Sequence, residues 1–387
     1  MKKQKSHSRL AATANKTLSF LRDSQRLLPL GLAFGLPQLL RAENHVDYRY
    51  EYYGEENDRM KIETHSVYFE QKLSDAVTAK GELIYDGISG ATPTGAYGSK
   101  GKPALQKLED TRRAGNVELV WRMGDHKLAP AFAYSRENDY ESYGISVGDA
   151  IEFNDKNTVL QLGVGHNFDS VRQADRVNWL GKDSTEAIIG ISQLLSPRDI
   201  LNVAFTYGYE SGYLTDPYRQ IIYNDSGFPD SEIRPAYRSK EVVLVSLTHH
   251  FDALNASLEG SYRFHHDSYG IFSHTVGLNW HQWLGQHLML EPMFRFYQQS
   301  AASFYGTSVG GYFFGDGSGL EPAYYSADYR LSNFYSLDYG LDATVLITDY
   351  FHLNLGYHRY EMNGLDNTPA AAYPKANIFT VGFSILW

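Results

Sequence analysis

The stretch LNASLEGSYRF, residues 254–264, alternates apolar and polar side chains at every second position. One parity holds Leu254, Ala256, Leu258, Gly260, Tyr262 and Phe264, and the other holds Asn255, Ser257, Glu259, Ser261 and Arg263. A β-strand points successive side chains to opposite faces, so this period sorts one apolar face from one polar face. The pattern therefore predicts a strand that lies between two different environments.

The same period recurs along the chain in sixteen segments. The expected strands are 45–53, 60–72, 77–86, 112–123, 127–136, 140–154, 158–168, 184–195, 199–210, 236–251, 254–266, 269–283, 287–301, 324–347, 350–362 and 374–387. No comparable stretch after residue 44 keeps a period of 3.6 residues, so we expect few helices.

The connections between these segments alternate in length. Every second one is tight (73–76, 124–126, 155–157, 196–198, 252–253, 284–286 and 348–349), whereas the others include all the long ones (87–111, 169–183, 211–235, 302–323 and 363–373). Outer-membrane barrels have short periplasmic turns and long extracellular loops, and closure leaves no sheet edge in lipid. A soluble β-sandwich also alternates, but nothing in it sorts loops by length. We therefore predict an all-β fold: a transmembrane antiparallel up-and-down β-barrel of about sixteen strands, with both termini periplasmic.

The first 42 residues differ in composition from the rest. Seven basic residues precede the Leu-rich run 27–40, which ends at Leu40 and is followed by Arg41 and Ala42. This order predicts a signal peptide at 1–42 and a barrel at 43–387, with an N-terminal amphipathic arm as the alternative. Residues 1–42 hold 8 of the 35 Lys and Arg and 1 of the 45 Asp and Glu, which leaves 27 basic and 44 acidic residues, a net charge of −17. We expect no nucleic-acid partner for so acidic a chain.

The C-terminal segment keeps apolar side chains at every second position up to the last residue. These are Phe379, Val381, Phe383, Ile385 and Trp387. The pattern resembles the C-terminal assembly signal of bacterial outer-membrane proteins, with Trp where Phe is usual. It implies outer-membrane lipid and the assembly machinery as partners, and an ordinary last strand is the alternative.

A barrel of about sixteen strands is too wide for its side chains to fill, so we expect a water-filled lumen unless loops or another protein plug it. The predicted lumen-lining residues are Lys80, Glu82, Glu118, Arg122, Glu259, Arg263, Glu291, Arg295, Asp338 and Asp342. They form either a hydrated wall cross-linked between neighbouring strands or a selectivity ladder for a charged solute. One parity also persists over 325–347, which predicts a strand that projects beyond the membrane and brings Asp328 and Arg330 near the mouth.

Three segments carry a family resemblance: DGISGATPT at 86–94, GYLTDPYR at 212–219 and YSADYRLS at 325–332. They resemble recurring motifs of the bacterial DUF3570 proteins, over nearly the whole chain after the signal. The resemblance implies an outer-membrane barrel with no established activity. It also implies a periplasmic flavin-bearing protein or a small lipoprotein as a partner.

The candidate loop and mouth residues in these segments are Asp86, Ser89, Thr92, Pro93, Asp216, Pro217, Tyr218, Arg219, Asp328 and Arg330. They either shape loops that fold over the mouth or bind a ligand or partner. The first segment is expected to leave its strand at Asp86 and to hold a loop through side-chain bonds of Asp86, Ser89 and Thr92 to local backbone.

Enzyme motifs are weak in this sequence. Residues 144–148, GISVG, match G-x-S-x-G, but the serine lies in an alternating strand and not at a strand-to-helix elbow. The pairs at 249–250 and 265–266 place their histidines on opposite strand faces, so neither can chelate one metal. We expect no catalytic residue, no metal and no cofactor. The expected function is a porin-like channel, or a sheath for a solute or for a redox or secretion partner. A barrel-embedded hydrolase and a scaffold barrel with an occluded lumen are the alternatives.

Overall fold

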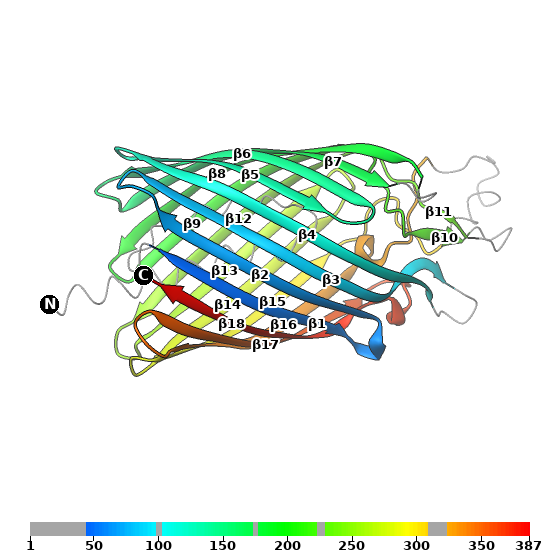
Figure 1. The fold of residues 1–387 in the computed structure, drawn as a ribbon. Coiled ribbons are helices and arrows are strands. Elements are labelled where there is room, and N and C mark those ends of the chain that lie inside the picture. The colour runs from blue at the N-terminus through cyan, green and yellow to red at the C-terminus, as the bar shows by residue number, and fades with distance from the viewer. Residues whose placement is uncertain (1–43, 98–102, 173–176, 223–228, 309–322) are drawn as a thin grey trace.

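The computed structural model describes residues 44–97, 103–172, 177–222, 229–308 and 323–387. Sixteen strands form one closed antiparallel barrel (Figure 1). They are β1 (His45–Glu55), β2 (Met60–Lys72), β3 (Val77–Tyr97), β4 (Pro103–Met123), β5 (His126–Arg136), β6 (Tyr140–Phe153), β7 (Thr158–Arg172), β8 (Trp179–Ser196), β9 (Asp199–Gly212), β12 (Tyr237–Phe251), β13 (Ala256–Asp267), β14 (Phe272–Leu284), β15 (Leu288–Gln299), β16 (Phe334–Leu346), β17 (Phe351–Gly364) and β18 (Lys375–Leu386). Strands β1 and β18 pair and close the ring.

A separate two-stranded sheet, β10 (Gln220–Ile222) and β11 (Pro229–Ser231), stands at one end of the barrel (Figure 1). Three 3-10 turns complete the described structure: η1 (Glu56–Asp58), η2 (Tyr329–Leu331) and η3 (Ala370–Ala372). Within the described ranges, no helix is long and apolar enough to cross a membrane.

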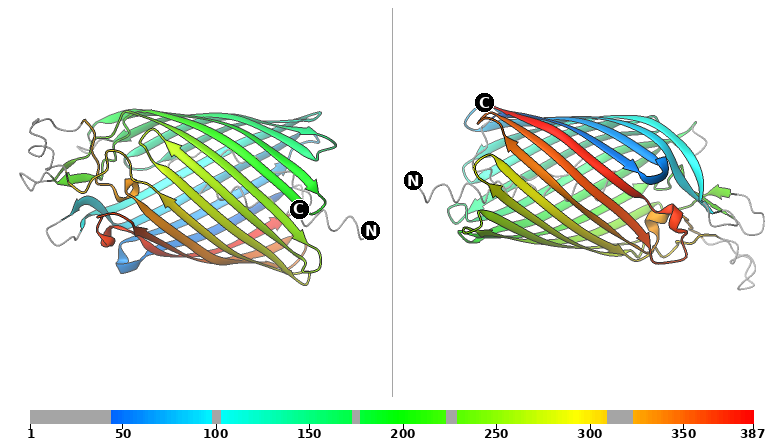
Figure 2. Two further views of the ribbon diagram at one scale, coloured as in Figure 1. Left: turned by 180° about the vertical axis from the view of Figure 1, so that it is seen from behind. Right: turned by 90° about the horizontal axis from the view of Figure 1, so that it is seen from below.

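The two ends of the barrel differ in their connections, as predicted. One end carries only tight turns, such as the turn between β4 and β5, where Gly124 has a φ of +61°. The other end carries the long connections, including the one between β15 and β16. His45, at the start of β1, pairs with Leu386, at the end of β18. The start of the first strand and the end of the last strand therefore lie together at the short-turn end of the barrel (Figures 1 and 2). The predicted barrel class and strand number are confirmed.

The alternation of the sequence is an alternation between the outside and the inside of the barrel. In β13, Glu259 points to the inner face and is 1% exposed. Tyr262, three positions along the same strand, points to the outer face and is 43% exposed. Large apolar side chains such as Leu83, Ile145 and Leu278 are likewise exposed on the outside. A soluble protein buries such side chains, whereas a barrel in lipid presents them outward.

Two predicted segments are wrong. Residues 87–111 were expected to form a loop, but β3 and β4 continue into this range, with a register irregularity between Pro93 and Tyr97. Residues 324–333 were expected to belong to a long strand, but β16 begins only at Phe334. The segment before it instead forms isolated bridges through Tyr325 and Ser326 and then the turn η2. The proposed signal peptide at 1–42 lies outside the described residues.

The misassigned strand has a physical explanation. Asp328 accepts a hydrogen bond from the backbone N–H of Arg330 and thereby caps η2. Tyr329 and Leu331 then pack into two different apolar clusters. The alternating parity of this segment therefore arises from packing on two sides of a turn, and not from a strand between lipid and water.

Candidate functional site

A folded cap lies across the barrel mouth at the long-loop end. We define the mouth cap as residues 213–222, 229–236 and 323–333, which include β10, β11 and η2. Its Tyr218 hydroxyl donates to Asp139 in the β5–β6 loop, and its Leu331 carbonyl accepts from the Ala302 amide after β15, at 2.8 Å. These two attachment points lie on well-separated parts of the ring of strands. The cap therefore crosses the opening and does not extend from one side of it.

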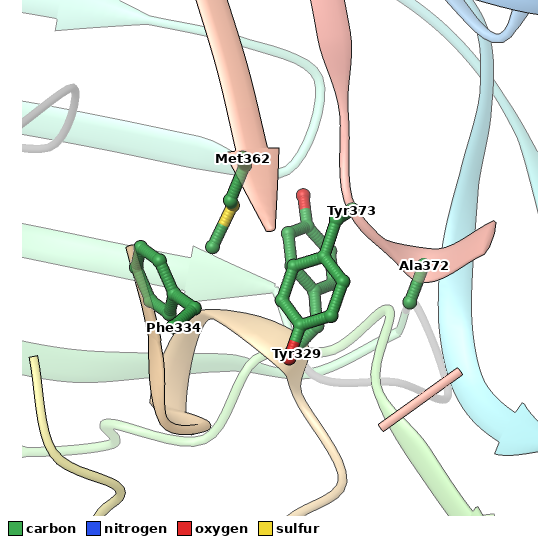
Figure 3. Close-up of a cluster of buried hydrophobic side chains, with 5 residues drawn as sticks. All are labelled: Tyr329, Phe334, Met362, Ala372 and Tyr373. Carbon is green, nitrogen blue, oxygen red and sulfur yellow. The ribbon is translucent and has the colours of Figure 1, made fainter. Parts of the chain in front are cut away.

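Apolar clusters hold the mouth cap against the wall. Tyr329 packs with Phe334, Met362, Ala372 and Tyr373, which come from β16, β17 and the connection to β18 (Figure 3). A second cluster joins Leu331 to Tyr269, Ile271 and Ala302. A third lies within the cap itself and joins Ile221 of β10 to Tyr325 and Ala327. Because the packing ties the cap to several strands, the mouth cap is a folded part of the barrel.

A buried group of charged side chains lies within the cap. We define the cap cluster as Asp216, Arg219, Glu232, Arg234, Asp328 and Arg330, three acids and three arginines. Asp328 is 1% exposed and lies at its centre. Its carboxylate accepts from Arg234 Nη2 at 2.7 Å and from Arg330 Nε at 2.9 Å, and it lies 3.5 Å from Arg219 Nε. One carboxylate therefore contacts all three guanidinium groups.

The other two acids complete the pairing of the arginines. Glu232 pairs with Arg234 Nε at 2.7 Å, and Asp216 pairs with Arg330 and lies 3.7 Å from Arg219. Each charged side chain of the cluster therefore has an opposite charge beside it, as the burial of charge requires. The formal charges of the three acids and three arginines also cancel.

The three sequence segments that carry the family resemblance meet in this cluster. Arg219 of the second segment donates to the Pro93 carbonyl and, at 3.2 Å, to Thr92 Oγ1 of the first. Arg330 of the third segment donates to Asp216 of the second. Pro217 follows Asp216 within the cap and belongs to no strand. Residues far apart in the sequence thus form one connected site.

The arginines control the ionisation of the central acid. Burial alone would favour a protonated Asp328, but Arg330, Arg219 and Arg234 outweigh it and hold the pKa of Asp328 well below its usual range. The same balance, with burial opposed mainly by Arg330 and Arg219, lowers the pKa of Asp216. Asp328 and Asp216 are therefore ionised at neutral pH, whereas burial, opposed by Arg234 and reinforced by Asp328 and Asp216, raises the pKa of Glu232.

A second polar group lines the wall beside the cap. Asp86 accepts from Thr64 Oγ1 at 2.6 Å and from Arg112 Nη1 at 3.2 Å. The expectation that Asp86 bonds local backbone in a loop is wrong, because β3 continues through it and places it beside β2 and β4. Ser89 also lies in β3, opposite Lys61 of β2.

The wall group also contains three carboxylates that the sequence did not indicate. Ligand oxygens of Asp110, Glu137 and Asp139 lie within 4.8 Å of one another. Arg112 Nε lies 3.8 Å from Glu137, and Asp139 accepts from Tyr218 of the cap. Burial, reinforced by Asp110 and Asp139 and opposed by Arg112, raises the pKa of Glu137 to about 7. Only the pairing of β4 with β5 brings Asp110 close to Glu137 and Asp139. Asp110 is far from the other two acids in the sequence, and the three form no recognisable sequence motif.

The ten predicted lumen residues occupy the inward parity of their strands. The register places Lys80 opposite Glu118 and Arg295 opposite Asp338. Two histidines that the sequence analysis did not select also join this face: His281 lies 2.6 Å from Glu291, and His358 lies 3.1 Å from Asp342. The inner face also carries Glu82, Arg122, Glu259 and Arg263. Neighbouring strands therefore supply the partners.

The C-terminal aromatic and aliphatic row lies on the outer face. Phe379, Val381, Ile385 and Trp387 are exposed. Phe383 packs against Tyr48 of β1 with ring centroids 5.4 Å apart, across the seam that closes the barrel.

Comparison with known proteins gives one family match. The family described as "Protein of unknown function (DUF3570)" matches residues 36–101, 97–180 and 172–373. No curated protein matches the sequence.

Solved structures similar to this chain are outer-membrane proteins of low identity. The siderophore receptor PirA from Pseudomonas aeruginosa is 10% identical with a TM-score of 0.45, over 89% of this chain and 61% of the receptor. A bacterial polysaccharide outer membrane secretin is 11% identical with a TM-score of 0.46, over 90% and 99%. A loop-deletion mutant of OmpT, an outer membrane protein of Vibrio cholerae, is 8% identical with a TM-score of 0.44, over 90% and 99%. The chain thus spans about three fifths of the length of the receptor.

Proposed function

This chain belongs to the DUF3570 family, and we propose that it forms a water-filled passage through the outer membrane, narrowed at its mouth by the cap. The observation that carries the proposal is the inner face of a closed barrel of sixteen strands, which is polar and charged along its length. Barrels of this strand number leave an aqueous channel when nothing fills them. The solutes that fit such a wall are small and hydrophilic.

The mouth cap would limit the size of solute that passes. It crosses the opening and is held by buried ion pairs, so passage requires a gap beside the cap or a displacement of it. The mixed charges of the inner wall, such as Arg295 opposite Asp338, favour hydrated solutes without selecting one sign of charge strongly. We propose the long-loop end as the extracellular end. The end of the β1–β18 seam at which His45 pairs with Leu386 then lies on the periplasmic side.

A sheath for a partner is the second candidate, because a cap this well packed could also occlude the lumen. A periplasmic flavin-bearing protein or a small lipoprotein as partner is supported only by the family resemblance. The absence of catalytic activity remains a prediction.

Conductance in planar bilayers tests the proposal. We expect the purified wild-type barrel to conduct ions in discrete steps, and Asp328→Asn, which loosens the cap, to give larger steps. Asp252→Asn is the matched control, because Asp252 pairs with Arg198 at 2.5 Å in the turn at the opposite end. A barrel that is folded but silent in both wild-type and Asp328→Asn form would contradict the passage. A silent wild type with a conducting Asp328→Asn variant would favour the occluded sheath.

A further inference from the structure

Two arginines face outward side by side near the long-loop end. Arg113 of β4 lies directly opposite Arg136 of β5 in the strand register. Their neighbours Arg112 and Ser135 bond each other on the inner face, Nε to Oγ at 3.1 Å. Because strand neighbours point to opposite faces, Arg113 and Arg136 point away from the lumen, and both are exposed.

No ion pair or hydrogen bond within the described residues holds either guanidinium group. The carboxylate opposite Arg136 is Glu141, and it instead accepts from the hydroxyls of Tyr134 at 2.9 Å and Tyr143 at 3.3 Å. Like charges directly across a strand pair destabilise a sheet. An external anion between the two arginines would remove this cost.

The pair lies at a particular depth on the outer wall. Tyr85 lies opposite Arg113, and Tyr134 and Tyr143 lie beside Arg136 on the same outward face. Toward the other end of the barrel this face becomes aliphatic, with Leu83 64% exposed and Ile145 52% exposed. Belts of aromatic residues mark the border between hydrocarbon and headgroups in outer-membrane barrels. The arginines therefore stand where headgroups begin.

We propose that Arg113 and Arg136 bind a phosphate group of lipid A, the phosphorylated glycolipid of the outer leaflet. A planar guanidinium matches phosphate oxygens in a bidentate geometry, and two of them together match the charge of a phosphate monoester. A lipid fits this site better than free phosphate does, because its acyl chains would lie along the exposed aliphatic side chains below. The site requires the long-loop end to face outward, but it does not depend on whether the lumen conducts.

Lipid binding to the purified barrel tests the site. Native mass spectrometry would compare wild type, Arg113→Gln/Arg136→Gln and the control Arg198→Gln, an exposed arginine in a turn at the opposite end. The probes are bisphosphorylated lipid A, dephosphorylated lipid A, phosphatidylglycerol and inorganic phosphate. Folding of each variant is checked by the mobility shift between heated and unheated samples.

We expect wild type and Arg198→Gln to retain bisphosphorylated lipid A equally, and the double variant to bind it about tenfold more weakly. We also expect Arg113→Lys/Arg136→Lys to bind at an intermediate level, because it keeps the charge and loses the bidentate geometry. Equal binding by the folded double variant would overturn the proposal, as would equal binding of dephosphorylated lipid A. Phosphatidylglycerol or inorganic phosphate binding as tightly as lipid A would overturn the assignment to this lipid.

Discussion

Replacing Asp328 by Asn should release the mouth cap while leaving the barrel intact. The substitution keeps the size of the side chain and one carbonyl-type acceptor, and removes the negative charge at the centre of three arginines. Asp216 and Glu232 then remain to balance Arg219, Arg234 and Arg330. One positive charge is left in excess within the buried cluster, with its nearest contacts weakened.

The expected cost follows from the burial of the pair. Asp328 is 1% exposed and holds Arg234 at 2.7 Å and Arg330 at 2.9 Å. Removing one partner from a buried ion pair typically costs about 3–5 kcal/mol, because the other charge stays buried and unpaired. That energy raises the fraction of opened cap by between about a hundredfold and a few thousandfold. The exposed pair Asp252–Arg198 should cost less than about 1 kcal/mol when broken by Asp252→Asn.

Hydrogen exchange of backbone amides measures this opening directly. The Ile233 amide bonds the Tyr325 carbonyl at 3.0 Å and the Leu331 amide bonds the Asp328 carbonyl at 2.8 Å, so both report on the cap. Both should exchange at least about a hundredfold faster in Asp328→Asn than in wild type, while amides between β13 and β14 stay unchanged. Exchange at Ile233 and Leu331 that is within a fewfold of wild type, in a folded variant, would refute the idea that the ion pairs hold the cap.

Three further outcomes follow from the structure. The pKa of Glu137 is raised from 4.5 to about 7, so the folded mouth favours the protonated acid. The stability of the mouth should therefore be highest below about pH 4.5 and should fall as the pH rises toward 7. Glu137→Gln should remove that pH dependence and stabilise the mouth at pH 8, as measured by amide exchange at both pH values. Leu278→Arg on the outer face should cost about 2–4 kcal/mol in a urea titration in liposomes, whereas Asn279→Arg on the inner face should cost much less. Trp387→Ala should lower the amount of barrel assembled in the outer membrane, measured on gels as the fraction that migrates as folded protein without heating.

The barrel could be predicted from the sequence because its wall repeats one physical requirement at every strand. A side chain that faces lipid must be apolar, and its neighbour faces water, so segments such as 254–264 carry the period of the fold in themselves. The tight turns could be found in the same way, since a short connection leaves little freedom in where each strand ends.

The position of the motif residues at the mouth was predicted, but their contacts were not, because these contacts join residues far apart in the chain. Arg330 and Asp216 are 114 positions apart, and only the closed barrel brings them together. The segment from Tyr325 to Leu331 kept a strand-like parity, but packing in the cap produces it. Resemblance to a family located the three motif segments without indicating that they touch one another.

Cysteine accessibility tests the central claim, that the outer face lies in lipid and the lumen holds water. The chain contains no Cys, so single substitutions can be made on a natural cysteine-free background. Ala131 and Ser146 lie opposite each other on the inner face, whereas Ile145 and Val147 flank Ser146 on the outer face. In proteoliposomes, a membrane-impermeant maleimide should label Ala131→Cys and Ser146→Cys and spare Ile145→Cys and Val147→Cys. Equal labelling of both parities, or labelling of the outer positions alone, would contradict the account.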